Sequence, residues 1–294
     1  MVRWSRIEHV FVKRFGGKNL GVQPRTIESP ADPRIADYVG LRDADLRART
    51  ELEQGIFIAE GTNVVRRLLS SGLRVRSVLV TPRRHAQLAA ELDRIDAPVY
   101  VAARPILEAV AGFDLHRGVV AAAERPVAPS LAATLSTART VVVLEALNDR
   151  ENLGAIARST RALGGDALLL DPQCADPFYR RVVRVSMGEV LFLPIVRLAP
   201  WPGALEAVRA AGFTVAALTP AAEAVSLYEW SPPERVALLV GAEGPGLSSS
   251  AQSSADVRLR IPIRADVDSL NVGHALAIAL AFVSAGRAAA PPAS

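Results

Sequence analysis

The chain has 294 residues, of which 50% are hydrophobic and 22% are charged, with a formal net charge of +4 at pH 7; these values allow two compact domains and exclude a chain that is disordered throughout. No apolar run reaches the roughly 18–20 residues that span a bilayer, and the N-terminus lacks the apolar core of a signal peptide, so we expect a cytoplasmic protein. The single cysteine, Cys174, excludes an internal disulfide, and no cluster of metal-ligating residues is expected.

Residues 1–30 are predicted to form a basic N-terminal arm. Up to Arg25 this segment carries six basic residues against the single acidic residue Glu8, and it shows no clean hydrophobic periodicity. An excess of cations suggests a polyanionic partner such as a nucleic acid. Every basic residue after Lys18 is an arginine, which suits phosphate contacts but follows equally from a GC-rich genome. Basicity alone is therefore weak evidence of function.

Residues 31–125 are predicted to form a small α/β domain, because short apolar strands alternate there with amphipathic stretches. The predicted strands are 56–59, 75–80, 99–101 and 118–123, and the predicted helices are 62–69, 86–92 and 106–110. Residues 126–138 are rich in proline and small side chains, which is typical of a linker between domains.

The same alternation restarts after the linker and predicts a second domain over residues 139–287, followed by a disordered tail at 288–294. The predicted strands are 141–144, 167–170, 190–196, 213–218, 236–240 and 257–261, and a last helix is predicted over 271–285. Strands that are apolar throughout indicate a parallel sheet covered on both faces. Ligands of such sheets bind outside the carboxyl ends of the strands, so the loops there are the candidate site.

Two of these loops carry polar residues and glycines. In the first, Asn152 and Gly154 stand at a predicted helix start and Arg158 lies one to two turns into the helix; Asn152 could equally be a helix cap and Arg158 a solvated arginine. The second, Gly241–Ser248, contains three glycines and the charged Glu243. It can bring backbone groups against a ligand, or it can be a tight turn without a function.

The third loop runs from Ile261 to the start of the last predicted helix and contains Ser269 and Asn271. Either residue could act only as the N-cap of that helix, which is a common role for both residue types. Residue type and spacing do not decide between a cap and a binding site.

Taken together, the three loops resemble the three motifs of the SpoU/TrmH RNA methyltransferases of the SPOUT superfamily, in the family's order. The matching residues are Asn152-x-Gly154-Ala-Ile-x-Arg158-Ser, Gly241-x-Glu243-Gly-x-Gly-Leu-Ser and Ile261-Pro-Ile-x-x-x-Val-x-Ser269-Leu-Asn271-Val. Upstream, Phe57-Ile-Ala-Glu60-Gly61 and His116-Arg-Gly118-Val-Val-Ala121 resemble the L7Ae/L30e-like RNA-binding domain that often precedes this catalytic domain.

The resemblance implies an S-adenosylmethionine-dependent methyltransferase in which an α/β domain with a deep trefoil knot binds the cofactor, and which forms a homodimer through the knot region. Carried over by position, the adenosine pocket would be lined by Leu218, Gly241, Ile261 and Leu270. The catalytic residues would be Arg158, as base or phosphate anchor, with Asn152, Glu243, Ser269 and Asn271 as orienting groups. One departure is Glu189, which stands where the family usually has a small residue.

The resemblance therefore predicts 2′-O-methylation of a ribose in RNA. We favour ribosomal RNA as the substrate, because tRNA-directed relatives usually lack the extra N-terminal domain. A tRNA ribose methyltransferase, a base methyltransferase and a non-catalytic RNA-binding or ribosome-assembly factor are the alternatives.

Overall fold

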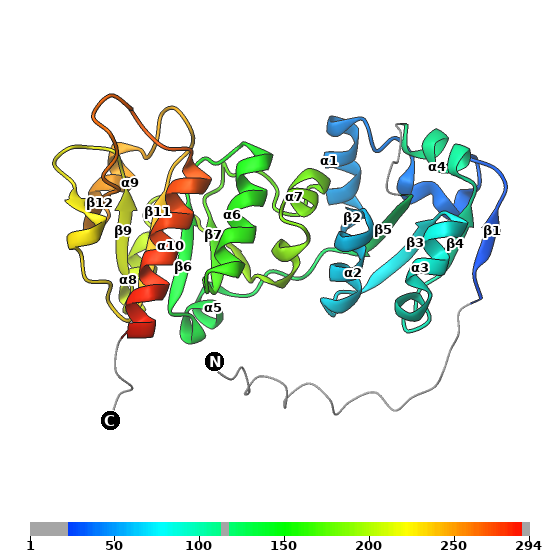
Figure 1. The fold of residues 1–294 in the computed structure, drawn as a ribbon, viewed down its shortest axis with the longest axis horizontal. Coiled ribbons are helices and arrows are strands. Elements are labelled where there is room, and N and C mark those ends of the chain that lie inside the picture. Colours follow the sequence, from blue (N-terminus) through cyan, green and yellow to red (C-terminus); the bar gives the residue numbers. More distant parts are fainter. Residues whose placement is uncertain (1–22, 113–117, 290–294) are drawn as a thin grey trace.

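A computed structural model describes residues 23–112 and 118–289, which form two α/β domains joined end to end (Figure 1). Most of the predicted arm (1–22), His116 and the last residues of the predicted tail (290–294) lie outside the described residues. None of the helices in the described ranges combines the length and the apolarity needed to cross a bilayer.

The first domain is built on a five-stranded sheet of order β1-β4-β3-β5-β2, in which β1, β4 and β3 are parallel and β5 is antiparallel to both β3 and β2. Its elements are β1 (Arg25–Ile27), η1 (Pro33–Tyr38), α1 (Ala44–Glu53), β2 (Ile56–Glu60), α2 (Thr62–Ser70), β3 (Val75–Val80), α3 (Pro82–Leu92), β4 (Val99–Ala102), α4 (Arg104–Ala111) and β5 (Val119–Glu124).

Strand β1 departs from the sequence prediction, which placed residues 25–27 in the basic arm. It pairs in parallel with β4, and the side chain of Ile27 is buried against Ile35 and Tyr38. A strand of three residues has too few side chains to show a period of two. It forms here because the edge of β4 supplies hydrogen-bonding partners and the core receives one apolar side chain.

The second domain is built on a seven-stranded, fully parallel sheet of order β10-β12-β9-β11-β6-β7-β8, as its apolar strands predicted. Its elements are α5 (Leu131–Thr137), β6 (Thr140–Leu144), α6 (Arg150–Ala162), β7 (Ala167–Leu170), α7 (Arg180–Val185), η2 (Glu189–Phe192), β8 (Ile195–Arg197), α8 (Leu205–Ala210), β9 (Thr214–Leu218), β10 (Val225–Ser226), η3 (Leu227–Glu229), β11 (Val236–Val240), α9 (Ser249–Ser253), β12 (Val257–Arg260) and α10 (Val272–Ala289).

Helices cover both faces of this sheet. Apolar side chains of α6, α7 and α10 pack with one set of alternate strand residues, and side chains of α5, α8 and α9 pack with the other set. In Figure 1, α6 and α10 lie side by side in front of the sheet. The site loops are thus held at one edge of a rigid layered core.

Two further segments, both after residue 125, differ from the sequence prediction. The predicted strand 190–196 is a 3-10 turn, η2, followed by the short strand β8, which begins just after Pro194; proline has no N–H to give to a sheet, so pairing starts after it. The predicted linker 126–138 contains helix α5, which Ser130 caps through the amide of Ala133 (3.1 Å) and whose Leu135 is buried in the second domain.

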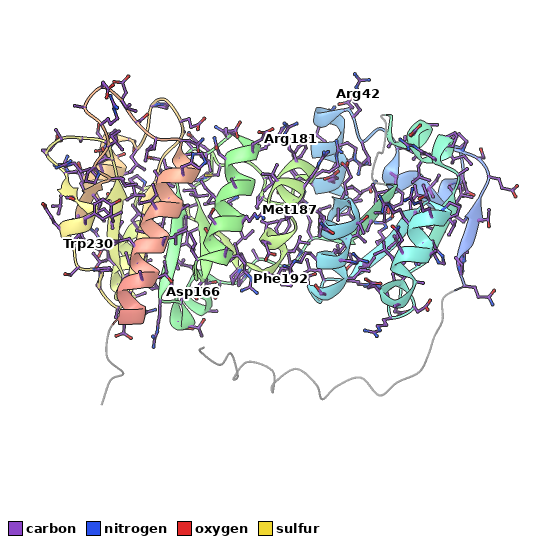
Figure 2. All side chains as sticks on the ribbon, in the orientation of Figure 1. Arg42, Asp166, Arg181, Met187, Phe192 and Trp230 are labelled. Carbon is purple, nitrogen blue, oxygen red and sulfur yellow. The ribbon has the colours of Figure 1, made fainter. Side chains whose placement is uncertain are left out.

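The two domains share one continuous hydrophobic cluster. Residues of β2, β5 and α2 belong to the same cluster as residues of α6 and α7, and the rings of Phe57 and Phe178 lie 5.6 Å apart across the junction. In Figure 2, Met187, just after α7, is labelled on the side of the second domain that faces the first. The trefoil knot implied by the resemblance stays a prediction.

Candidate active site

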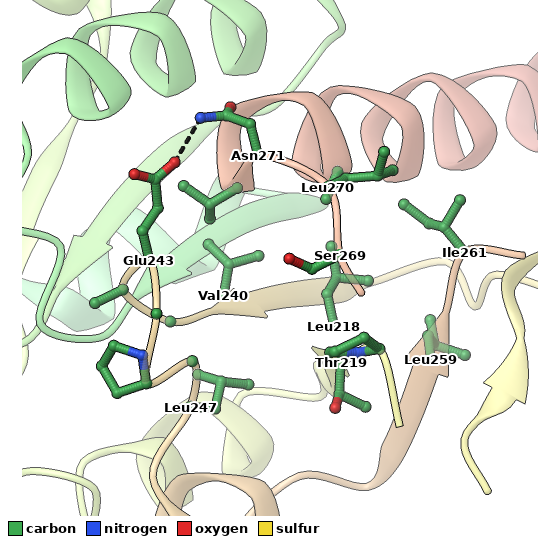
Figure 3. Close-up of a pocket in the computed structure, with 18 of the residues that line it drawn as sticks. Leu218, Thr219, Val240, Glu243, Leu247, Leu259, Ile261, Ser269, Leu270 and Asn271 are labelled. Carbon is green, nitrogen blue, oxygen red and sulfur yellow. Dashed lines mark hydrogen bonds between the residues drawn. The ribbon is translucent and has the colours of Figure 1, made fainter. Parts of the chain in front are cut away.

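A cavity of about 530 Å³ opens at the carboxyl ends of β9, β11 and β12 (Figure 3). Its walls are the loop 241–248, the loop 261–271 and the start of α10. The volume falls within the range of about 300–1,000 Å³ that is usual for small-molecule sites. The position agrees with the rule that open parallel sheets bind ligands beyond the ends of their strands.

Seven of the nine residues predicted for the site line this cavity. They are Leu218, Gly241, Glu243, Ile261, Ser269, Leu270 and Asn271. Asn152 reaches the same place through a hydrogen bond to Asn271, whereas Arg158 does not line the cavity. Side chains that are up to 119 positions apart in the sequence are thus brought together at one edge of the sheet.

The glycine loop turns back on itself in a way that requires Gly241. A Cβ atom at Gly241 would lie 2.3 Å from the backbone carbon and oxygen of Gly246, so no side chain fits there. The amide of Gly246 donates to the carbonyl of Ala242 (3.0 Å), and Gly244 and Gly246 adopt positive φ angles of 85° and 68°. The turn leaves backbone groups, rather than side chains, as much of this wall of the cavity.

The buried carboxylate of Glu145 fixes the far end of this loop, and sequence reasoning missed it. Glu145 follows β6 and is 6% exposed. Its oxygens accept hydrogen bonds from the hydroxyl and amide of Ser248 (2.6 and 2.7 Å) and from the indole N–H of Trp201 (2.6 Å). The sequence feature that could have identified Glu145 is its position as a charged residue directly after an apolar strand, at the edge of the sheet where the other site loops lie.

Asn271 connects the third loop to the other two. Its side-chain nitrogen donates to Oδ1 of Asn152 (2.9 Å) and to Oε1 of Glu243 (2.6 Å; Figure 3). Its side-chain oxygen accepts from the amides of Gly273 (2.9 Å) and His274 (3.2 Å). Asn271 therefore caps α10 and also contacts the other two site loops, so its two interpretations from the sequence, helix cap and site residue, do not exclude each other.

Asn152 does not act as a cap of α6. The carboxylate of Asp149 accepts from the Asn152 amide (2.7 Å) and caps the helix, so the side chain of Asn152 is left to accept from Asn271. Asn152 is only 9% exposed. A buried amide oxygen needs a donor, and Asn271 supplies it.

Arg158 is exposed on α6, and it lies outside the cavity of its own chain. It follows Asn152 by six residues, which is about 1.7 helical turns, so the two side chains do not share a face. Arg158 points to the outer surface of the helix layer.

The cavity pairs an apolar floor with polar walls. Leu218, Val240, Leu259, Ile261 and Leu270 contribute apolar surface, and the two loops contribute backbone groups. This combination suits a flat ring system whose edges form hydrogen bonds. Among the described residues, no group of three or more His, Cys, Asp or Glu could hold a metal ion.

Fold and site together define a two-domain α/β protein with a ligand pocket at the carboxyl edge of a parallel sheet. Residues 139–281 match the family model described as the SpoU rRNA methylase family, and residues 58–128 match the one described as RNA 2′-O ribose methyltransferase substrate binding.

Relatives with names and solved structures agree with these matches. An uncharacterized tRNA/rRNA methyltransferase of Mycobacterium tuberculosis is 44% identical over 88% of this chain and 91% of its own length. The 23S rRNA (guanosine(2553)-2′-O)-methyltransferase RlmP of Bacillus subtilis is 28% identical over 86% of this chain and 97% of its own length. The AdoMet-bound rRNA methyltransferase structure of Sinorhizobium meliloti is 27% identical, with a TM-score of 0.76, and covers 92% of this chain and 100% of that chain.

The chain belongs to the SpoU family of S-adenosylmethionine-dependent RNA methyltransferases, as its three motifs predicted. S-adenosylmethionine is its cofactor, and the residues present fit that molecule. The apolar floor offers contact area for an adenine ring, and the folded-back glycine loop offers backbone donors and acceptors for its edges and for the ribose.

Proposed function

We propose that this enzyme methylates a ribose 2′-hydroxyl of ribosomal RNA. The observation that carries the proposal is the hydrogen-bonded chain Asn152–Asn271–Glu243, which unites the three motif loops beside the cofactor cavity. One comparison supports the reaction, because residues 58–128 match a substrate-binding domain of RNA 2′-O ribose methyltransferases. Another supports the substrate, because a relative matched over 97% of its length carries the name of a 23S rRNA 2′-O-methyltransferase. We also propose that the reaction takes place in the cytoplasm.

The cofactor supplies a methyl group on a sulfonium, which is already activated for transfer. The protein therefore has to align a hydroxyl with that methyl and manage one proton. The carboxyl group of Glu243 lines the cavity, and Asn271 holds it in place. We assign Glu243, Asn271, Asn152 and Ser269 to orienting the ribose and the cofactor.

We assign Arg158 to holding the phosphate beside the target ribose. A guanidinium is not deprotonated in proteins and forms bidentate contacts with phosphate, so an anchor fits its chemistry better than a proton acceptor. In its own chain Arg158 lies outside the cavity. We therefore propose that it serves the cavity of a second copy.

A homodimer that packs the outer faces of α6 and α10 would bring Arg158 to that position. Helix α10 is apolar along most of its length, yet Ala281 is exposed and Ile278 and Phe282 are only partly buried. A helix that is apolar all round is normally buried on all sides. A symmetric pairing would cover this face and complete two sites at once.

Incubation with tritiated S-adenosylmethionine and purified ribosomal or transfer RNA, followed by nucleoside analysis, tests the function. We expect label in a 2′-O-methylnucleoside from ribosomal RNA or a ribosomal particle. Label in tRNA would show that tRNA, rather than ribosomal RNA, is the substrate. Label in a base would show that the enzyme methylates bases rather than riboses. Cofactor binding without transfer to any of these RNAs would favour a non-catalytic RNA-binding factor.

A further inference from the structure

The junction between the two domains is built around a buried carboxylate that the methyl-transfer chemistry does not use. Glu60, at the end of β2, is 4% exposed. It forms ion pairs with two arginines of α7 in the other domain, with Nη1 of Arg180 and with Nη1 of Arg184 (3.3 Å). Arg180 also donates to the backbone carbonyl of Leu41 (3.1 Å) in the first domain.

Two further ion pairs cross the junction at separate points. Arg125 donates from both terminal nitrogens to the carboxylate of Asp176 (2.9 and 2.6 Å) and from Nε to the carbonyl of Ile56 (2.8 Å). Arg67 of α2 pairs with Glu189 of η2 (2.9 Å). Together with the pairs of Glu60, these contacts join the two domains through three sets of charged side chains.

Helix α7 connects this junction to the catalytic residues. A Cβ atom at Gly154 of α6 would lie 2.7 Å from Cβ of Val185, so α7 and α6 pack as closely as two helices can at that point. Gly154 follows Asn152 by two positions on the same helix, and Asn152 accepts from Asn271 in the cavity wall. Packed, nearly incompressible elements therefore connect Glu60 to the site.

We propose that Glu60 is a positioning residue, which together with α7 holds the RNA-binding domain at one fixed orientation, so that the enzyme selects its RNA by the distance between the bound element and the methylated ribose. This inference rests on the proposed function. Flexible tethering of the first domain would make methylation tolerant of that distance. A fixed orientation makes methylation depend strongly on that distance, because misplacing the reacting atoms by about 1 Å can lower the rate about 100-fold.

The test compares the parent with Glu60→Gln and with Asp176→Asn, which weakens a separate crossing pair. Glu91→Gln is the matched control, because Glu91 pairs with Arg66 (2.8 Å) inside the first domain. The first readout needs no activity. Spin labels at Ala90→Cys in α3 and Ala207→Cys in α8, both exposed positions, report the distribution of distances between the domains.

Cys174 is only 6% exposed and burial raises the pKa of its thiol to about 12, so it reacts slowly with the label. An excess of unlabelled protein ensures that nearly every dimer with a labelled subunit contains only one. We expect one narrow distribution for the parent and Glu91→Gln, and broadened distributions for the two junction variants. A distribution for Glu60→Gln as narrow as that of the parent would overturn the proposal. If Glu60→Gln fails to fold, Arg184→Gln, which removes one of the two ion pairs of Glu60, is measured in its place, and a narrow distribution for that variant would overturn the proposal.

The second readout uses the mapped substrate RNA with the helix between the recognised element and the target lengthened or shortened by one base pair. For the parent and Glu91→Gln we expect kcat/KM to fall by about 100-fold on these RNAs, and for the junction variants by less than about tenfold. An equal fall in all four proteins would overturn the proposal. If the parent transfers methyl groups to no ribose, the proposed function fails, whereas the distance measurement still decides whether the domains are fixed.

Discussion

Asn271 shows how one side chain can satisfy a structural and a catalytic requirement together. Its oxygen caps α10, and its nitrogen holds Glu243 and Asn152. Both tasks need the amide, because a carboxylate could cap but not donate, and an alkyl group could do neither. The two roles can be separated by substitution.

Asn271→Ser retains a hydroxyl that can cap the helix but loses the donors to Glu243 and Asn152, whereas Asn271→Ala loses both. We expect methyl transfer to fall by about 10- to 100-fold in each variant, because an orienting hydrogen bond to a charged group is lost. Asn271→Ala should also unfold with a free energy about 1 kcal/mol lower than that of Asn271→Ser. Thermal unfolding and single-turnover kinetics measure the two effects, and parent-like transfer by Asn271→Ser would contradict the assignment.

At the scale of elements, the loop 241–248 depends on Gly241 for its shape. Gly241→Ala places a methyl group against the backbone of Gly246, and overpacking of this kind costs about 1–3 kcal/mol. Because the displaced backbone is the wall of the cavity, we expect the Kd of S-adenosylmethionine to rise about tenfold or more.

Gly203→Ala is the matched control, because the nearest atom to its added Cβ, the carbonyl oxygen of Pro200, is 3.7 Å away. Its cofactor affinity should equal that of the parent. Titration calorimetry on both variants checks the pair; equal affinities of Gly241→Ala and Gly203→Ala would show that the loop does not form the binding wall.

The elements that the sequence predicted best are those with the strongest local signals. Strands β7 and β11 lie where uninterrupted apolar runs predicted them, and the seven-stranded sheet is parallel as expected. Strand β1 and helix α5 were missed because tertiary pairing and packing, rather than periodicity, stabilise such short segments. The apolar run at 190–192 was wrongly read as a strand because length and hydrophobicity alone do not separate a strand from a buried turn.

The site was predictable only in part. The motif residues stand where loops follow strands, so their gathering at one edge followed from the topology. The contact between Asn152 and Asn271 joins residues 119 positions apart, and the contacts of Glu145 with Trp201 and Ser248 are also long-range. No local pattern encodes such pairs, and the cap and site interpretations of Asn271 were separable only in three dimensions.

At the scale of the whole molecule, the position of Arg158 makes a prediction about assembly. If Arg158 serves the partner subunit, co-expressed Arg158→Ala and Asn271→Ser chains complement each other, because a mixed dimer contains one site with both residues intact. Half of randomly assembled dimers are mixed and one of their two sites is complete, so activity should return to about one quarter of the parent's. Activity no higher than that of the two variants measured separately would place Arg158 in its own chain's site.

The central proposal is that the methyl group is transferred to a ribose 2′-oxygen, and removing that one atom from the substrate tests it. Once the methylated nucleotide is mapped, the same RNA is made with one 2′-deoxynucleotide at that position, and methyl transfer from S-adenosylmethionine is measured on both. We predict that the deoxy substrate binds with unchanged affinity and accepts no methyl group, since the cavity presents the methyl to a ribose hydroxyl. Transfer to the deoxy RNA at the parent rate would contradict the account and assign the reaction to the base.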